Sequence, residues 1–187
     1  MDKITGESKI TIQVARPIVY DYLADFMHHP QWVKNVFKLI PLEKGNIGVG
    51  AKFRTLEFTP PTSLGRTLAA TLQYTLGVFK GVAPMSICEI TALEPLQRIA
   101  WVGYLTQGRN GMFNRAEWEL LIEAQGDNTC VTQRFCYLPQ NARARKMLAS
   151  LGDGKGIAES CLVSLEKLKQ VLEHQAATKP TPKTLMA

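Results

Sequence analysis

The chain has 187 residues, of which 45% are hydrophobic and 20% charged, values typical of a globular protein with one domain. A chain of this length buries roughly 70% of the surface that it exposes when unfolded, so it needs no disulfide or metal ion to hold its fold. No run approaches the ~20 apolar residues of a membrane span, and the polar N-terminal residues are unlike a secretory signal peptide.

The net charge of +6 is a modest basic excess. A basic cluster of Arg143, Arg145, Lys146 and Lys155 favours an anionic ligand or transient contact with a membrane surface. A solvated surface is the simpler interpretation of the same charges. No nucleic-acid-binding motif accompanies the cluster, so nucleic acid is not an expected partner.

The cysteines are Cys88, Cys130, Cys136 and Cys161. None lies in a CxxC pair, and no histidine lies near them at a zinc-ligand spacing. We therefore expect free thiols in a reducing cytosol, which makes the protein cytoplasmic. Neither a metal site nor a cofactor is expected.

The first elements are a strand and two short helices. Residues 8–14 alternate between apolar and polar side chains, which predicts a half-buried strand. Pro17 then begins a helix, because a missing N–H costs nothing in the first helical turn. Pro30 is expected to end this helix, and Trp32 lies in a second, shorter one.

Two further strands are predicted at residues 36–42 and 51–58. The glycine-rich turn between them, residues 45–50, lacks the Lys-Ser/Thr ending of a phosphate-binding loop and precedes no helix, so a tight hairpin is the better interpretation. Residues 64–82 carry a leucine at every fourth position at first, a spacing that fits a helix face and a strand face alike. Residues 59–84 are therefore an expected lid or insertion.

The strand pattern resumes at Met85 and continues through four strands to Leu138. The third of these alternates clearly, because Ala116 and Trp118 share one face while Glu117 lies on the other. The sequence Gly-Asp-Asn at 126–128 predicts a tight hairpin before the last strand.

A long helix ends the ordered chain. Asn141 is expected to cap its first turns, and the glycines near Gly152 are expected to bend or interrupt it, since each costs about 1 kcal/mol relative to alanine inside a helix. Residues 176–187 are an expected disordered tail. An apolar stripe follows the glycines and consists of Ile157, Cys161, Leu165, Leu168 and Leu172.

This order of elements predicts an α+β domain, residues 1–175, in which a curved antiparallel sheet wraps around the long helix. The arrangement resembles the helix-grip (SRPBCC) superfamily, which includes START lipid-transfer domains, birch-pollen-allergen-like proteins and polyketide cyclases. The long stretch at 59–84 departs from a minimal member. The segments that carry the resemblance are residues 15–32 (ARPIVYDYLADFMHHPQW), 43–58, 89–103, 116–135 and 164–173.

The resemblance implies that the protein binds or carries a small hydrophobic ligand, such as a lipid, an isoprenoid or a polyketide-like compound. A curved sheet and one helix meet imperfectly and tend to leave an apolar pocket between them. One alternative is an enzyme of the polyketide cyclase or dehydratase type, in which a Tyr, Arg or His would move a proton. A protein-interaction module that uses the lid and the basic tail is another.

No nucleophile motif with a Ser, His and Asp or a Cys and His is present, so catalytic residues stay unassigned. The titratable side chains that could face a cavity also have a simpler interpretation as outward-facing sheet residues; they are Arg54, Tyr74, Tyr104, Arg134 and Tyr137. The residues expected to line the cavity are Trp32, Arg54, Trp101, Trp118, Phe135, Ile157, Cys161 and Leu165.

Overall fold

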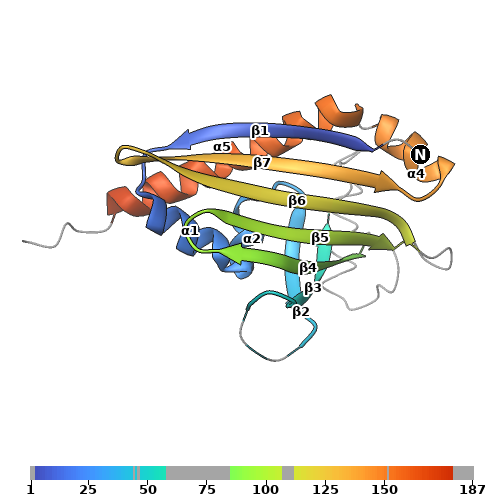
Figure 1. The fold of residues 1–187 in the computed structure, drawn as a ribbon, viewed down its shortest axis with the longest axis horizontal. Coiled ribbons are helices and arrows are strands. Elements are labelled where there is room, and N and C mark those ends of the chain that lie inside the picture. The colour runs from blue at the N-terminus through green and yellow to red at the C-terminus, as the bar shows by residue number, and fades with distance from the viewer. Residues whose placement is uncertain are drawn as a thin grey trace, which may run out of the picture.

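The computed structural model describes residues 3–43, 45, 47–57, 85–106, 112–150 and 152–178. One strand, three short helical segments, a meander of strands and a long final helix follow one another along the chain (Figure 1). The elements are β1 (Ile4–Ile12), α1 (Arg16–Ala24), η1 (Phe26–His28), α2 (His29–Trp32), β2 (Val36–Pro41), β3 (Lys52–Glu57), β4 (Met85–Glu94), β5 (Arg98–Thr106), β6 (Met112–Gln125), β7 (Asn128–Pro139), α4 (Ala142–Ser150) and α5 (Asp153–Thr178).

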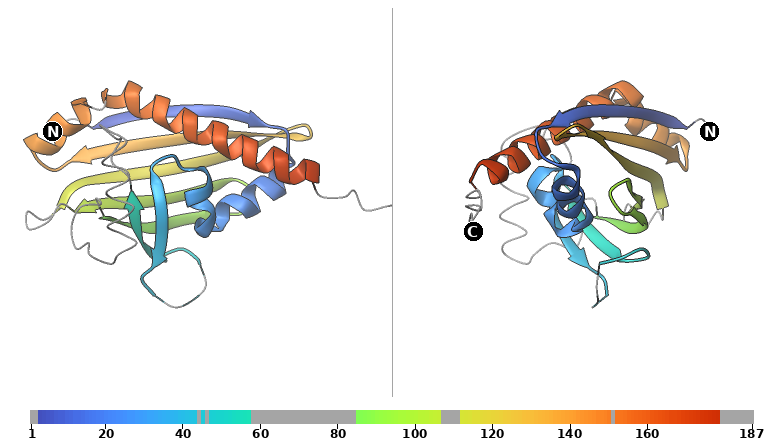
Figure 2. Two further views of the ribbon diagram at one scale, coloured as in Figure 1. Left: turned by 180° about the vertical axis from the view of Figure 1, so that it is seen from behind. Right: turned by 60° about the vertical axis from the view of Figure 1, so that its left-hand side comes forward.

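The described strands form one antiparallel sheet in the order β1-β7-β6-β5-β4-β3-β2. Strands β2 to β7 are a meander in which each strand pairs with the next one along the chain, and β1 closes the sheet beside β7. Figure 2 shows that the sheet curves and that α5 crosses its concave face. The expected α+β architecture, a curved antiparallel sheet around a long C-terminal helix, is therefore confirmed.

The period-two pattern of the strands determines which side chains face α5. On β6, Ala116, Leu120 and Ile122 are buried, whereas Glu123 is exposed. This is the alternation that the sequence predicts, since successive strand residues point to opposite faces. The concave face therefore carries the apolar core.

Helix α5 packs along the edge strand β1. Its predicted apolar stripe is buried. A Cβ added at Gly154 would lie 2.8 Å from the carbonyl oxygen of Thr5, and one added at Gly6 would lie 3.4 Å from the carbonyl oxygen of Gly154. Two glycines thus allow the helix and the strand to approach closely. The hydroxyl of Ser8 donates to the carbonyl of Ala158 at 2.7 Å and ties the same two elements together.

Two predicted boundaries are wrong near the N-terminus. Strand β1 begins at Ile4, earlier than the expected residue 8. Pro30 does not end the first helix, because α1 stops at Ala24 and Pro30 lies in the first turn of α2. Proline is tolerated there since the first N–H groups of a helix have no intrahelical partner.

The C-terminal predictions are confirmed up to the end of the helix. The N–H of Ala144 donates to Oδ1 of Asn141 at 2.8 Å, which caps α4. Gly152 has φ +83° and separates α4 from α5, a conformation that glycine adopts at little cost. Helix α5 continues to Thr178, so residues 176–178 are helical and do not belong to a tail.

The predicted lid at 59–84 and the rest of the tail, 179–187, lie outside the described residues. Within the described ranges, no helix has the length and apolar character needed to cross a membrane.

Candidate functional site

A row of aromatic side chains crosses the concave face. Trp101 on β5 is paired in register with Trp118 on β6, which is paired with Phe135 on β7. Residues opposite one another in register point to the same face. The rings of Trp101 and Trp118 are nearly parallel, and their centroids are 6.2 Å apart. The ring centroids of Trp118 and Tyr137 are 5.5 Å apart. These four rings form an apolar wall that faces α5.

The neighbouring row of the sheet contains three small residues and one tyrosine. In this row Cys88, Gly103, Ala116 and Tyr137 lie side by side on β4 to β7. Among the described residues, a Cβ at Gly103 would meet only the carbonyl oxygen of Ala116, at 3.9 Å. Trp118 and Tyr137 also remain partly exposed although they lie on the covered face. The described side chains therefore leave unfilled space above Gly103.

Helix α5 supplies the opposite wall. Ile157 and Cys161 are buried and pack in one apolar cluster with Ile4 and Phe135, against which Trp118 also packs. Burial raises the pKa of the Cys161 thiol to about 12, so the thiol stays neutral at physiological pH.

Polar side chains gather at one end of this space. The hydroxyls of Thr55 and Ser86 donate to Oε1 of Glu57 at 2.8 and 2.5 Å, and they also contact each other. Thr55 and Ser86 are buried and Glu57 is half-buried. All three follow the concave-face alternation of Phe53 and Cys88, so the cluster lies inside the curve of the sheet.

The charge of Glu57 acts on other concave-face groups. Burial raises the pKa of the Tyr137 hydroxyl, and the carboxylate of Glu57 raises it further, as does Cys161. The pKa of Cys88 is also raised, to about 12. Burial is the larger cause, and the charge of Glu57 is the next. Tyr137 therefore keeps its proton as a hydrogen-bond donor. The space thus has aromatic walls and a polar end with one acceptor group and one donor group.

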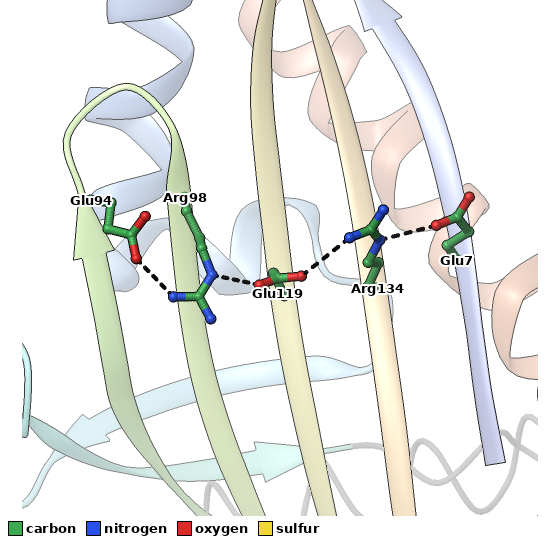
Figure 3. A network of polar contacts seen from close by, with 5 residues as sticks. All are labelled: Glu7, Glu94, Arg98, Glu119 and Arg134. Atoms are coloured by element: carbon green, nitrogen blue, oxygen red, sulfur yellow. Dashed lines mark hydrogen bonds and ion pairs between the residues drawn. The ribbon is translucent and has the colours of Figure 1, made fainter. Parts of the chain in front are cut away.

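The opposite, convex face is charged. An alternating ladder of Glu94, Arg98, Glu119, Arg134 and Glu7 joins five strands through contacts of 2.8, 2.5, 3.7 and 3.1 Å (Figure 3). Three members of the ladder, Arg98, Glu119 and Arg134, also line a hollow of about 380 Å³. Because these charged side chains line it and it is open to solvent, the hollow suits water better than an apolar ligand.

Five of the eight residues expected to line the cavity come together. Trp101, Trp118 and Phe135 form the sheet wall, and Ile157 and Cys161 form the helix wall.

The other three expected residues are Trp32, Leu165 and Arg54. Trp32 and Leu165 belong to the larger core cluster, together with Trp101 and side chains of α1 and α2. Arg54 is exposed, because it lies on the face of β3 opposite to Phe53 and Thr55. The sequence interpretation of Arg54 as an outward-facing residue is therefore the one that the structure supports.

The titratable candidates divide in the same way. Tyr137 faces the space, whereas Arg134 is exposed in the convex ladder. Tyr104 is opposite Arg115 in register, in the convex-face row next to Val102 and Glu117. Tyr74 lies outside the described residues.

The sequence analysis missed Thr55, Glu57, Ser86 and Gly103 as site residues. The alternation of Phe53, Thr55 and Glu57 could have placed the carboxylate on the core face of β3. A glutamate in a strand is nevertheless usually exposed, and the pattern alone favours that interpretation.

Within the described ranges, no group of three or more His, Cys, Asp or Glu side chains could hold a metal ion. His28 and His29 are adjacent, but His28 stacks on Tyr22 and His29 stacks on Phe26. Neither ring nitrogen of His29 has a hydrogen-bond partner in the described part of the chain, and burial lowers its pKa to about 3.

No family model and no curated protein matches the sequence. Solved structures do match. The Zhui aromatase/cyclase from Streptomyces sp. R1128 aligns with a TM-score of 0.65 at 14% identity, over 94% of this chain and 96% of that chain. A START superfamily protein from Mycobacterium smegmatis aligns with a TM-score of 0.61 at 14% identity, over 92% and 99%.

Ginseng major latex-like protein 151 from Panax ginseng aligns with a TM-score of 0.60 at 12% identity, over 90% and 97% of the two chains. The chain has the helix-grip fold. The expected resemblance is confirmed at the level of the fold. Sequence identities of 12–14% support a shared fold and no statement about function. In this helix-grip fold the candidate site occupies the space between the sheet and the long helix.

Proposed function

We propose that the protein binds or carries a small hydrophobic molecule, such as a lipid, an isoprenoid or a polyketide-like compound, between the sheet and α5. The observation that carries this proposal is the space that the described side chains leave above Gly103, beside the partly exposed rings of Trp118 and Tyr137. Ligand sites in proteins are typically concave and mostly apolar, with a few polar groups that orient the ligand.

The composition of the walls supports the same proposal. An apolar ligand that covers Trp118 and Tyr137 would gain about 25 cal/mol for each Å² of apolar surface removed from water. Two solved structures with the same fold are named as a START superfamily protein and a major latex-like protein. The free thiols of the described cysteines suit a reducing compartment such as the cytoplasm.

A substitution that fills the space tests the proposal. We expect Gly103→Leu to abolish binding of the neutral fluorescent dye Nile red, because the new side chain would project into the space where the dye is held. The thermal midpoint should change little, since few neighbours surround the new Cβ. Gly45→Leu makes the same chemical change in a loop where no described residue lies within 4 Å of the new Cβ, and it should retain binding. Unchanged dye binding in Gly103→Leu would rule out this site.

A second candidate function is a cyclase- or dehydratase-type enzyme that uses the same space. The polar end favours it, because Glu57 could accept a proton from a ligand carbon while the Tyr137 hydroxyl donates to a ligand carbonyl. The Zhui neighbour is itself named an aromatase/cyclase. Loss of water from a poly-β-ketone substrate, followed by mass spectrometry and absent in Glu57→Gln, would support the enzyme. If the substrate binds but no product forms, the enzyme function is ruled out and the binding or carrier function remains.

A further inference from the structure

The described residues contact only one oxygen of the Glu57 carboxylate. Oε1 accepts hydrogen bonds from Thr55 and Ser86. Among the described residues, no donor reaches Oε2, and no Lys, Arg or His forms an ion pair with Glu57 within 4.0 Å. Within the described part of the chain, two neutral hydroxyls therefore hold the half-buried charge on one side, although buried carboxylates usually have a cation or several donors around them.

Two described groups on which this charge acts are neutral. Tyr137 and Cys88 stay protonated because burial, and after it Glu57, raises both pKa values. After burial, Glu57 is the next cause of the raised pKa of Tyr137, so its negative potential acts on this part of the interior. A second negative charge placed there would be repelled, and an O–H group would be attracted to Oε2.

We propose that the interior site selects an apolar molecule that ends in a neutral hydroxyl donor, such as a phenol or an alcohol, and rejects carboxylic acids. This inference rests on the proposed binding function and specifies its ligand class. The apolar body of the ligand lies against Trp118 and Tyr137, and its hydroxyl donates to Oε2 of Glu57. Fatty acids, which are anionic at neutral pH, would place a carboxylate beside Glu57.

The magnitude of this selection follows from the loss of one hydrogen bond to a charged group. A site with a buried acceptor disfavours an analogue that lacks the donor, because the acceptor then stays unpaired. We expect at least about a tenfold difference in Kd between a hydroxyl compound and its methyl ether. The carboxylate analogue should bind more weakly than the ether, because charge repulsion adds to the missing hydrogen bond.

Three naphthalenes of similar size test the proposal by displacement of Nile red from the full chain. The wild-type protein should bind β-naphthol most tightly, β-methoxynaphthalene about tenfold more weakly and β-naphthoate most weakly. In Glu57→Leu the preference for β-naphthol should disappear. In Glu57→Gln, which removes the charge but keeps an acceptor, β-naphthoate should gain affinity. Glu117→Gln, on the convex face, is the matched control and should keep the wild-type order.

The possible outcomes separate this inference from the binding function. If the three compounds bind wild-type protein equally well and Gly103→Leu weakens all of them, the ligand class is wrong and the binding function stands. If none binds, or if Gly103→Leu changes nothing, the proposed function fails as well. The comparison of the three compounds on wild-type protein requires no variant. It therefore tests the proposed ligand class even if the Glu57 variants do not fold.

Discussion

His29 is enclosed by aromatic rings. It stacks on Phe26 at 4.3 Å between centroids and meets Trp101 edge-on at 5.3 Å. Its imidazole is buried, and its pKa is lowered to about 3, chiefly by burial. The folded protein therefore holds this histidine neutral, whereas the unfolded chain protonates it at the ordinary pKa of 6.5.

This difference predicts a loss of stability in mild acid. Between about pH 6.5 and pH 3 the unfolded state binds one more proton at this site, so stability falls as pH falls. At about pH 5 the free energy of unfolding should be roughly 2 kcal/mol lower than at neutral pH from this residue alone. Urea titrations across this range would measure it. His29→Leu should lack this component, and an identical pH dependence in both proteins would contradict the assignment.

At the scale of elements, the close contact between α5 and β1 places the start of the helix on the sheet. Gly154 and Gly6 allow this approach, and the hydrogen bond from Ser8 to Ala158 secures it. Further along, Nζ of Lys169 donates to the carbonyl of Thr11 at 3.0 Å. The helix is thus held against the edge strand β1. The middle of the concave face is covered by side chains and not by the backbone of the helix.

Gly154→Ala tests the close contact. The added methyl would lie 2.8 Å from the backbone oxygen of Thr5, so the helix or the strand must shift. We expect the free energy of unfolding to fall by about 1–3 kcal/mol, in spite of alanine's better helix propensity. Chemical denaturation measures the change. Gly48→Ala, whose new methyl has no neighbour within 4 Å among the residues that the structure describes, is the control and should alter stability little. A stabilised Gly154→Ala protein would show that the elements are not held so closely.

For the whole molecule, the question is whether α5 and the sheet enclose usable space. Cys161 lies on the inner face of α5, beside Ile157 and Phe135. In a close-packed core, Cys161→Trp would cost about 1–3 kcal/mol or more. We expect a smaller cost, measured by thermal unfolding, because the indole ring can enter the space above Gly103, and we expect Nile red binding to be lost.

Cys161→Ala is the control for this variant, because it removes only the sulfur atom and should keep the dye bound. A strongly destabilised Cys161→Trp protein that still binds the dye would mean that the dye occupies another place. The binding site between the helix and the sheet would then have to be abandoned.

The sequence by itself determined the architecture. The alternation in β6, the turn at Gly126 and the stripe from Ile157 to Leu172 are local patterns with periods of two and about 3.6 residues. Such periods depend only on the geometry of a strand or a helix, so they can be recognised before the chain is folded. The same period of two residues places Trp118 on one face of its strand with Ala116 and Leu120.

Only the tertiary structure decided which of these residues lie together and where charge enters the interior. Trp32 and Leu165 show the same apolar character as Phe135, yet they lie in the larger core cluster and Phe135 lies in the smaller one. Glu57 faces inward because the register of β3 on β4 places Thr55 opposite Ser86, and both hydroxyls then reach its carboxylate. Register and curvature join residues far apart along the chain, and a local period contains no information about either.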